Sequence, residues 1–280
     1  MTKLFPSRYL LDLARKSGTA VAALNFYNAE TLLAHVRAAN ELNASIILQT
    51  TESTIDYLGI KMIVAMATAA AEELDQPVAL HLDHGGSYEL AERCVDHGYT
   101  SVMIDGSKLP FEQNCELTQR VARLAHANGV SVEGELGHVA HNDELGVTDA
   151  DKYFTRAEDA AQFMAITGVD ALAVAIGTAH GFYKGEVKLD FDRLVSIREA
   201  TGSTALVLHG GSGVPDELLR TAIKSGITKI NFGTELKEAF TRAVKQTVCN
   251  TTEIDLRKTF HPAISAVQEV SAKKIRLCRG

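Results

Sequence analysis

The sequence has few cysteines and no excess of positive charge. Its four cysteines are Cys94, Cys115, Cys249 and Cys278, and no two of them form a CxxC pair. Their spacing fits no disulfide framework, so we expect free thiols in a reducing compartment. The formal net charge of −7 at pH 7 argues against nucleic acid as a partner.

Long apolar runs are also missing. The first 18 residues lack the continuous apolar core of a signal peptide and instead indicate a short amphipathic helix. The apolar stretch 60–74 is interrupted by Lys61 and ends in acidic residues, so we do not expect it to span a membrane. These absences predict a cytoplasmic protein without a membrane partner.

Short apolar runs rich in strand-forming residues recur along the whole chain, with helix-like stretches between them. The runs cover 21–26, 45–50, 78–83, 101–105, 130–136, 171–177, 204–210 and 229–234, and the clearest helical stretches are 29–42, 87–98 and 111–129. Eight such units of roughly 30 residues each match the size of a (β/α)8 TIM barrel. We therefore predict an α/β protein with one barrel domain over residues 1–280.

A doubly wound sheet is the alternative fold. Such a sheet usually has fewer strands, and a glycine-rich phosphate loop follows its first strand. Here the first run ends in Asn25, Phe26, Tyr27 and Asn28, with no glycine. The barrel is therefore favoured.

One polar insertion, at about 138–154, interrupts the alternation after the fifth run. In a barrel, loops at this end of the strands surround the active site. The insertion is either a lid over that site or an ordinary surface loop, and the sequence leaves both interpretations open.

Three histidines lie at or just past the ends of predicted strands. His84, His180 and His209 follow the third, sixth and seventh runs, and each directly precedes a glycine. Strand ends of a parallel barrel converge on one rim, so ligands from distant parts of the chain can meet there. Three neutral imidazoles and one open position suit zinc better than magnesium or calcium. The pattern predicts a catalytic zinc site.

The other histidines carry weaker signals. By strand alternation we expect His81 to point the other way and to serve in packing. The helix-like segments hold His35, His97, His126 and His261, which we interpret as unrelated to the site. The polar insertion holds His138 and His141, whose roles stay open.

Acidic residues accompany the histidines on the same rim. Asp83 directly precedes His84, where it is either a general acid/base or a partner that orients a ligand histidine. Asp105 closes the fourth run. Glu133 and Glu135 share one face of the fifth run, and two acids on a buried face are costly without a cation or donors nearby. That cost favours a functional role, with a structural ion pair as the alternative.

Glycine-rich segments follow the last two predicted strands. The segment 210–213 reads GGSG, and 231–234 reads NFGT. The loops after the seventh and eighth strands of a barrel recur as a phosphate site, where a helix N-terminus supplies N–H groups. We expect a small phosphorylated ligand there.

Six segments, taken together and in order, resemble the class II, zinc-dependent ketose-bisphosphate aldolases, of which the fructose- and tagatose-1,6-bisphosphate enzymes are the best known. They read LHLDHG, GYTSVMIDGS, VEGELG, GVDALAVAIGTAHGFYKG, LVLHGGSGVP and KINFGTELKEAF. The resemblance implies cleavage of a phosphorylated ketose, a 1,6-bisphosphate or a similar 1-phosphate, to dihydroxyacetone phosphate and an aldehyde. It also implies Zn²⁺, a further Na⁺ or K⁺ ion near the phosphate, and a homodimer or homotetramer.

By position, the resemblance makes His84, His180 and His209 the zinc ligands and Asp83 the catalytic acid/base. It places Asp105 and Glu135 near an alternative metal position. The residues that it assigns to the substrate are Asn25, Thr51, Gly181, Gly210, Gly211, Ser212, Asn231, Phe232, Gly233 and Thr234, most of them at the C1 phosphate.

This chain also departs from the family pattern. The loop after the fifth strand commonly carries two glycines and then a glutamate, but here 140–144 has no glycine, so Asp143 or Glu144 is expected to move the donor proton. Thr51 replaces a common serine, and Arg257 is the candidate for a second phosphate. Our hypothesis is an ordinary donor half and an unusual acceptor half.

Three alternative functions fit the sequence less well. Lys184 and Lys229 lie near strand ends, as the nucleophile of a Schiff-base aldolase would, although a zinc site makes that lysine unnecessary. A zinc hydrolase on this barrel often begins with an HxH pair in its first strand, which 21–26 lacks. A non-catalytic barrel subunit that supports a partner aldolase is disfavoured because Asp83 and the three histidines are present.

Overall fold

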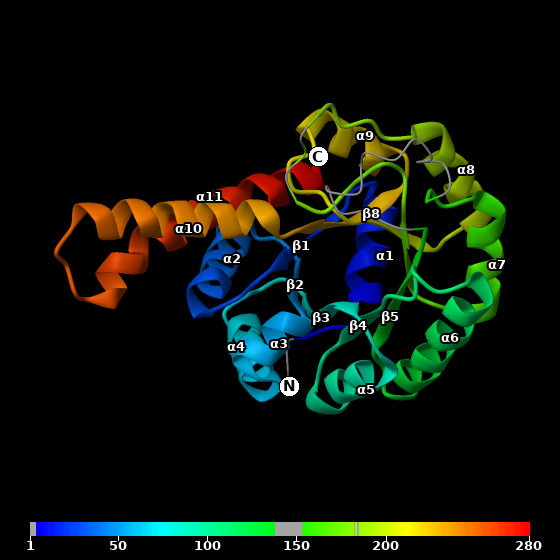
Figure 1. Cartoon of the computed structure of the whole chain (residues 1–280), viewed down its shortest axis with the longest axis horizontal. Helices are drawn as coiled ribbons and strands as arrows, with labels where there is room; N and C mark the ends of the chain where they lie inside the picture. Colours follow the sequence, from blue (N-terminus) through cyan, green and yellow to red (C-terminus); the bar gives the residue numbers. More distant parts are fainter. Residues whose placement is uncertain (1–3, 138–152, 182, 184) are drawn as a thin grey trace.

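The computed structural model describes residues 4–137, 153–181, 183 and 185–280, and in it eight parallel strands close into a barrel in chain order (Figure 1). The strands are β1 (Val21–Asn25), β2 (Ile46–Thr51), β3 (Val78–Gly85), β4 (Ser101–Ile104), β5 (Ser131–Leu136), β6 (Ala171–Val174), β7 (Ala205–Leu208) and β8 (Ile227–Phe232). Pairing of β1 with β8 closes the ring. The predicted TIM barrel is confirmed.

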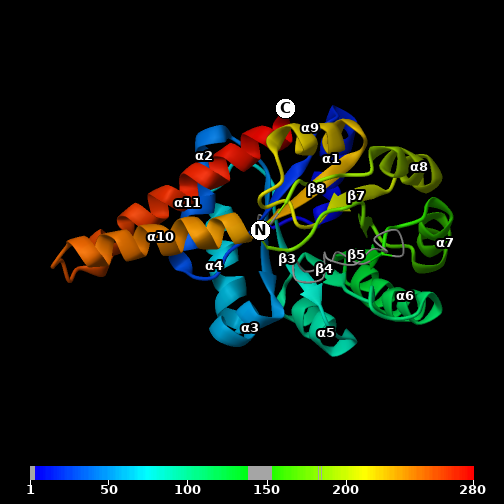
Figure 2. The ribbon, with the colours of Figure 1, turned by 45° about the horizontal axis from the view of Figure 1, so that its top comes forward.

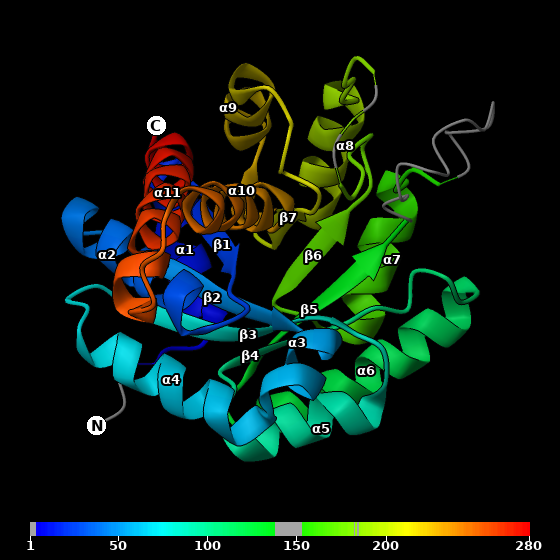
Figure 3. The ribbon, with the colours of Figure 1, turned by 60° about the vertical axis from the view of Figure 1, so that its left-hand side comes forward.

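Helices surround this ring of strands (Figure 3). They are α1 (Ser7–Ser17), α2 (Ala29–Leu42), α3 (Glu52–Leu58), α4 (Ile60–Glu72), α5 (Tyr88–His97), α6 (Phe111–Ala127), α7 (Ala157–Thr167), α8 (Phe191–Thr201), α9 (Asp216–Lys224), α10 (Thr234–Asn250) and α11 (Leu256–Arg279). Local sequence sets their ends. Asn28 and Thr31 form a reciprocal capping box at the start of α2, and Gly98 ends α5 with a φ of 102°.

The first helix closes the bottom of the barrel. The Ser7 hydroxyl lies 2.8 Å from the hydroxyl of Ser101, the first residue of β4. The backbone N–H of Arg8 donates to the hydroxyl of Ser131, the first residue of β5, over 3.1 Å. Leu10 and Leu11 of α1 pack with small inward-facing strand residues in a second core cluster. The predicted N-terminal helix therefore plugs the end opposite the strand termini that carry the histidines.

Helices α10 and α11 form a helical arm that extends beyond the barrel (Figures 1 and 2). Along its length the Phe240 and Phe260 rings stack with their centroids 6.1 Å apart, and α11 also packs on α2. At the tip of the arm, Val248, Ile254 and Leu256 expose 52%, 91% and 65% of their surface. The arm therefore ends in a group of apolar side chains that are exposed in the described part of the chain.

Two expectations from composition can be compared with the structure. All four cysteines are free, as predicted, and only Cys249 is exposed. No single helix in the described ranges has the length and apolarity needed to cross a membrane. Helices α3 and α4 together meet the same criterion, but the chain bends by 96° between them.

Candidate active site

The three histidines predicted from strand ends meet at the carboxyl-terminal mouth of the barrel. His84 lies near the end of β3 and His209 directly follows β7. His180 is six residues beyond β6, because that strand ends at Val174 rather than at the predicted 177. The ring centroid of His84 lies 5.0 Å from that of His180 and 4.6 Å from that of His209. One ring nitrogen of each histidine lies within 4.8 Å of the corresponding nitrogens of the other two.

An irregular backbone lets two consecutive residues face this mouth. Side chains of neighbouring strand residues normally point to opposite faces. Here the pairing register between β3 and β4 shifts between Leu82 and Gly85, and His84 adopts a left-handed φ of 51°. Residues other than glycine rarely take that conformation, and such strain gathers at functional sites. As a result, both Asp83 and His84 line the same cavity.

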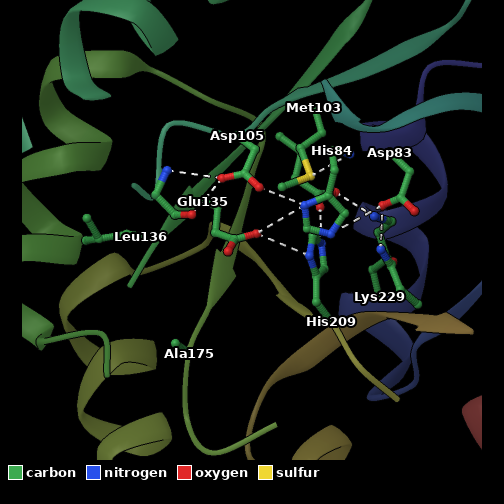
Figure 4. Close-up of polar contacts among 12 residues, drawn as sticks. Asp83, His84, Met103, Asp105, Glu135, Leu136, Ala175, His209 and Lys229 are labelled. Atoms are coloured by element: carbon green, nitrogen blue, oxygen red, sulfur yellow. Dashed lines mark hydrogen bonds and ion pairs between the residues drawn. The ribbon is translucent and has the colours of Figure 1, made fainter. Parts of the chain in front are cut away.

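The His84 ring is fixed from one side (Figure 4). Its Nδ1 lies 2.8 Å from Asp105 Oδ2, while Asp105 Oδ1 accepts from the backbone N–H and hydroxyl of Ser107. Burial opposes ionisation of Asp105, but its hydrogen bond with His84 and those from Ser107 hold its pKa well below the usual value. Asp105 thus orients His84 and leaves Nε2 buried without a hydrogen-bond partner.

The His209 ring is fixed from the opposite side. Its Nε2 lies 2.8 Å from Glu133 Oε1, and the other oxygen of Glu133 accepts from Lys229 Nζ over 2.7 Å. Although burial lowers the pKa of His209, Glu133 and Glu135 outweigh it and raise that pKa to about 10 in the metal-free protein. Nδ1 lies 3.2 Å from Glu135 Oε2, yet neither atom makes a hydrogen bond.

His81 lies below this site and corrects one expectation. It points into the barrel, on the same side as Asp83, because His84 and not His81 departs from regular alternation. Its Nδ1 is 2.7 Å from Ser101 Oγ and its Nε2 is 3.4 Å from Lys229 Nζ. Burial, with the Lys229 charge, lowers the pKa of His81 to about 3, so the ring is neutral. His81 is therefore a buried polar support, which agrees with packing but not with the expected direction.

The arrangement of donor atoms fits a metal ion. His84 Nε2, His209 Nδ1 and Glu135 Oε2 are buried and lack hydrogen bonds, although the last two lie 3.2 Å apart as an ion pair. A buried polar atom without a hydrogen bond is costly unless a ligand binds it. Two groups of side chains could each hold an ion within the described ranges: the three histidines, and His84 with Asp105 and Glu135. Nitrogen-rich sets with a carboxylate nearby suit zinc.

Asp83 sits beside these rings and is held by side-chain amides. Asn25 Nδ2 and Gln49 Nε2 donate to its Oδ2 over 2.9 Å and 3.2 Å, and Asn231 Nδ2 donates to its Oδ1 over 3.0 Å. Burial raises its pKa, but the positive charges at His84, His209 and Lys229 and the bond from Asn25 bring the pKa below its usual value. The carboxylate is therefore ionised and aimed at the cavity.

A cavity of about 520 Å³ opens at this mouth. Its lining combines most of the predicted site residues with three that the sequence did not single out: Asn25, Tyr27, Thr51, Asp83, His84, Asp105, Lys108, Glu135, His180, Gly181, Gly210, Ser212, Asn231, Gly233, Thr234 and Lys237. Its size is that of a pocket for a small molecule.

The glycine-rich loop after β7 and the start of α10 form one wall of the cavity. Ser212 Oγ accepts from the backbone N–H groups of Gly233 and Glu235, over 3.2 Å and 3.4 Å. Glu235 in turn accepts from the N–H of Gly213 and pairs with the buried Lys274 of α11 at 2.9 Å. The C-terminal helix thus supports the loop that was predicted to bind phosphate.

Two residues assigned to the substrate do not line the cavity. Phe232 is fully buried and packs against Lys274, whose Nζ lies 5.1 Å from the ring centroid. The N–H of Gly211 donates to the carbonyl of Asn231, and a Cβ on Gly211 would lie 2.5 Å from Ile230 Cγ2. Both residues shape the wall from behind.

Other predicted residues lie elsewhere. Arg257, the candidate for a second phosphate, pairs with Asp255 at 2.8 Å in the exposed part of the arm and does not line the cavity. The loop acids Asp143 and Glu144 lie outside the described residues. So do His138, His141 and Lys184, and with them nearly all of the insertion at 138–154.

A family model described as class II fructose-bisphosphate aldolase matches residues 6–280. The chain belongs to this family. Aldolase chemistry follows at the level of the family, and the resemblance seen in the sequence is confirmed. In this class II aldolase, the converging histidines lie in the mouth of the barrel.

Solved structures agree with the family assignment. The chain is similar to the YdjI aldolase from Escherichia coli K12, with 33% identity, a TM-score of 0.86 and coverage of 98% of this chain and 97% of that one. A protein of Coccidioides immitis provisionally named a fructose-1,6-bisphosphate aldolase has 29% identity, a TM-score of 0.87 and coverage of 96% and 94%. Fructose-bisphosphate aldolase from Campylobacter jejuni, at 23% identity and a TM-score of 0.77 with coverage of 97% and 93%, shares the fold.

Sequence reasoning missed several residues of this aldolase site. Gln49 pairs in register with Asn25 on the neighbouring strand, so its inward direction could have been read from strand alternation. Lys237 lies one helical turn after Thr234 and thus on the same face of α10. Lys108 gave no signal, because a lysine in a polar loop is ordinary.

Proposed function

We propose that this family member is a zinc-dependent aldolase that cleaves a phosphorylated ketose, a 1,6-bisphosphate or a similar 1-phosphate, to dihydroxyacetone phosphate and an aldehyde. The observation that carries the proposal is the meeting of three imidazoles, two with buried nitrogens that make no hydrogen bond, beside an ionised Asp83.

His84, His180 and His209 would hold the zinc ion, with Asp105 and Glu135 offering the alternative position. When bound, zinc supplies Lewis-acid stabilisation of the negative charge that develops on the substrate oxygens. Asp105 holds Nδ1 of His84 and Glu133 holds Nε2 of His209, so the other nitrogen of each ring would bind the ion. Such hydrogen bonds to ligand histidines raise the affinity for the metal.

Asp83 would act as the general base during cleavage. It takes the proton from the C4 hydroxyl as the C3–C4 bond breaks, and it returns that proton in condensation. The three amides fix the orientation of the Asp83 carboxylate and favour its charged form, and they carry no charge that would neutralise it. Asp143 or Glu144 is proposed to move the proton on the donor carbon.

The wall formed by the glycine-rich loop and α10 would hold the C1 phosphate. Gly181, Gly210, Ser212, Gly233 and Thr234 line it, and the N-terminus of α10 provides a positive dipole end. A Na⁺ or K⁺ ion near the phosphate is part of the proposal. Lys237, one turn into the helix, adds a cation at the same wall.

Schiff-base chemistry is disfavoured by the position of Lys229. Its ammonium is fully buried, pairs with Glu133 and does not line the cavity, so a substrate carbonyl has no route to it. The charge of Lys229 instead offsets that of Glu133.

We further propose a cytoplasmic homodimer or homotetramer. The free cysteines and the negative net charge support the location, and the exposed apolar tip of the arm supports self-association. Light scattering of Ile254→Asp should show smaller particles than the parent protein. An unchanged mass would exclude the tip of the arm as the contact.

A substrate panel tests the activity. Ketose 1-phosphates and 1,6-bisphosphates would be incubated with the zinc-loaded and the chelator-treated protein, and released dihydroxyacetone phosphate would be measured. We expect cleavage that disappears on chelation and returns with zinc. A protein that stays metal-free in zinc-replete medium and cleaves nothing would instead be the non-catalytic subunit.

A further inference from the structure

The cavity reaches across the mouth of the barrel, from one side to the other. In the closed order of eight strands, β4 lies opposite β8. The proposed phosphate wall follows β7 and β8, while Lys108 follows β4, and both contribute to the same cavity. A ketose anchored by its C1 phosphate at the first wall therefore directs its far end toward the side of β2 to β5.

The lining on that far side consists of Thr51, Asp83, His84, Asp105, Lys108 and Glu135 among the described residues. Asp105 is already bound to His84 and Ser107, and Glu135 lies against His209. Lys108 is the cation on this side, and it makes no ion pair within the described ranges. An ammonium group can donate three hydrogen bonds to a ligand.

The loop that carries Lys108 is held firmly. Ser107 is clamped to Asp105 Oδ1 by its backbone N–H and its hydroxyl, and the N–H of Leu109 donates to the carbonyl of Gly106 over 2.9 Å. Gly106 packs so closely on Asn114 that a side chain there would collide with it. Asn114 in turn donates to the carbonyl of Glu135 over 2.9 Å. The lysine therefore extends from a fixed base.

We propose that Lys108 binds an oxyanion at the far end of the substrate, so that the preferred substrates are ketose 1-phosphates with a terminal phosphate or carboxylate. This inference rests on the proposed aldolase function. Three carboxylates, Asp83, Asp105 and Glu135, share that side of the cavity, so an anionic end needs a local cation to offset their repulsion. Lys237 serves the opposite wall, which gives one cation for each anionic end.

Condensation assays isolate the far end, because dihydroxyacetone phosphate stays constant and only the aldehyde changes. Three aldehydes of matched length would be compared: one neutral, one with a terminal phosphate and one with a terminal carboxylate. The proteins are the parent, Lys108→Met, Lys108→Arg and a control, Lys61→Met, on the exposed side of α4. Thermal melting confirms that each variant is folded.

We expect Lys108→Met to lower kcat/KM for the anionic aldehydes by about ten- to a hundredfold, the range for a lost charge-assisted hydrogen bond, mainly through KM. The neutral aldehyde should change by less than about twofold, and Lys108→Arg should retain most of the preference, because the charge is kept. Lys61→Met should match the parent. The anion with the larger dependence on Lys108 identifies the natural terminal group.

Equal losses with neutral and anionic aldehydes, or no loss with either, would overturn the role of Lys108 while leaving the aldolase function in place. If the zinc-loaded parent neither cleaves nor condenses any compound, the proposed function fails, and this inference with it.

Discussion

Two buried carboxylates in the same barrel are stabilised in different ways. Asp83, at the mouth, is surrounded by three neutral amides and exposes one side to the cavity. Glu133, one layer deeper, contacts the ammonium of Lys229 and the ring of His209, and is 2% exposed. In both, burial raises the pKa and the neighbours lower it.

The difference agrees with a proposed reactive role for Asp83 and a supporting role for Glu133. The cations at His84, His209 and Lys229 lower the pKa of Asp83 from a distance, but its hydrogen-bond partners are neutral amides, so the carboxylate is ionised without a direct ion pair to Lys229. Lys229 neutralises Glu133 and fills its second oxygen, so that Glu133 can only orient His209. The sequence left open whether the two acids of the fifth strand have a functional role or form a structural ion pair. Glu133 forms an ion pair, and Glu135 lies at the proposed metal site.

The largest effect is expected at His84, the histidine next to Asp83 in the chain. His84→Ala removes a proposed zinc ligand, so zinc content by elemental analysis and cleavage should both fall to background. The fold should persist, since His84 is not part of the apolar core. A variant that keeps stoichiometric zinc would contradict the assignment of His84.

Asp83→Asn tests the reactive member of the pair. It preserves shape but removes the base, so we expect cleavage to fall by about a hundred- to ten-thousandfold while zinc is retained. Rates and metal content measured on the same preparation provide the check. Cleavage at the parent rate would show that Asp83 only orients its neighbours.

The Glu133–Lys229 pair tests the supporting member. Removing one partner leaves a buried charge, so Glu133→Ala or Lys229→Met should each lower the free energy of unfolding by about 3–5 kcal/mol. Glu133→Ala should also weaken zinc binding by about ten- to a hundredfold, through loss of the bond to His209. Denaturant melts and chelator competition measure the two effects.

Removing both charges of that pair is the matched control. Glu133→Leu with Lys229→Met should be more stable than either single variant, because no unpaired charge remains. A double variant as unstable as the sum of the singles would show that the pair acts as two independent groups.

The smallest effect is expected at Gln49, which supports Asp83 without lining the cavity. Gln49→Met removes one amide bond to a charged group, worth about tenfold in kcat. Zinc affinity should not change. An altered zinc affinity would mean that the amide network and the metal site are not separate.

Most of the fold could be predicted from the sequence because the barrel strands appear in it as regular apolar runs. Contacts across the barrel could not be predicted. Glu133 on β5, Lys229 on β8 and His81 on β3 meet only in three dimensions, so Lys229 could be read as a nucleophile. The left-handed backbone of His84 likewise has no signature in alternation, which is why the direction of His81 was misjudged.

The site was predictable where glycines and histidines follow strands and less so where ordinary residues take part. His84, His209 and Asp83 lie at strand ends and His180 lies six residues beyond one, and the structure brings these side chains together. Gln49 and Lys108 are common residue types whose importance depends on which neighbours surround them. β6 ends before the predicted residue because the loop residues that follow it, Ala175 and Ile176, are as apolar as the strand itself. β3 instead continues past the predicted end, through His84 to Gly85.

The wide spacing of the three histidines along the chain has a consequence for biosynthesis. His209 follows the seventh strand, and the ring of strands closes only when β8 pairs with β1. A growing polypeptide therefore carries the first imidazole long before it can complete a chelate. We expect metal capture to be a late event, after nearly the whole chain has left the ribosome.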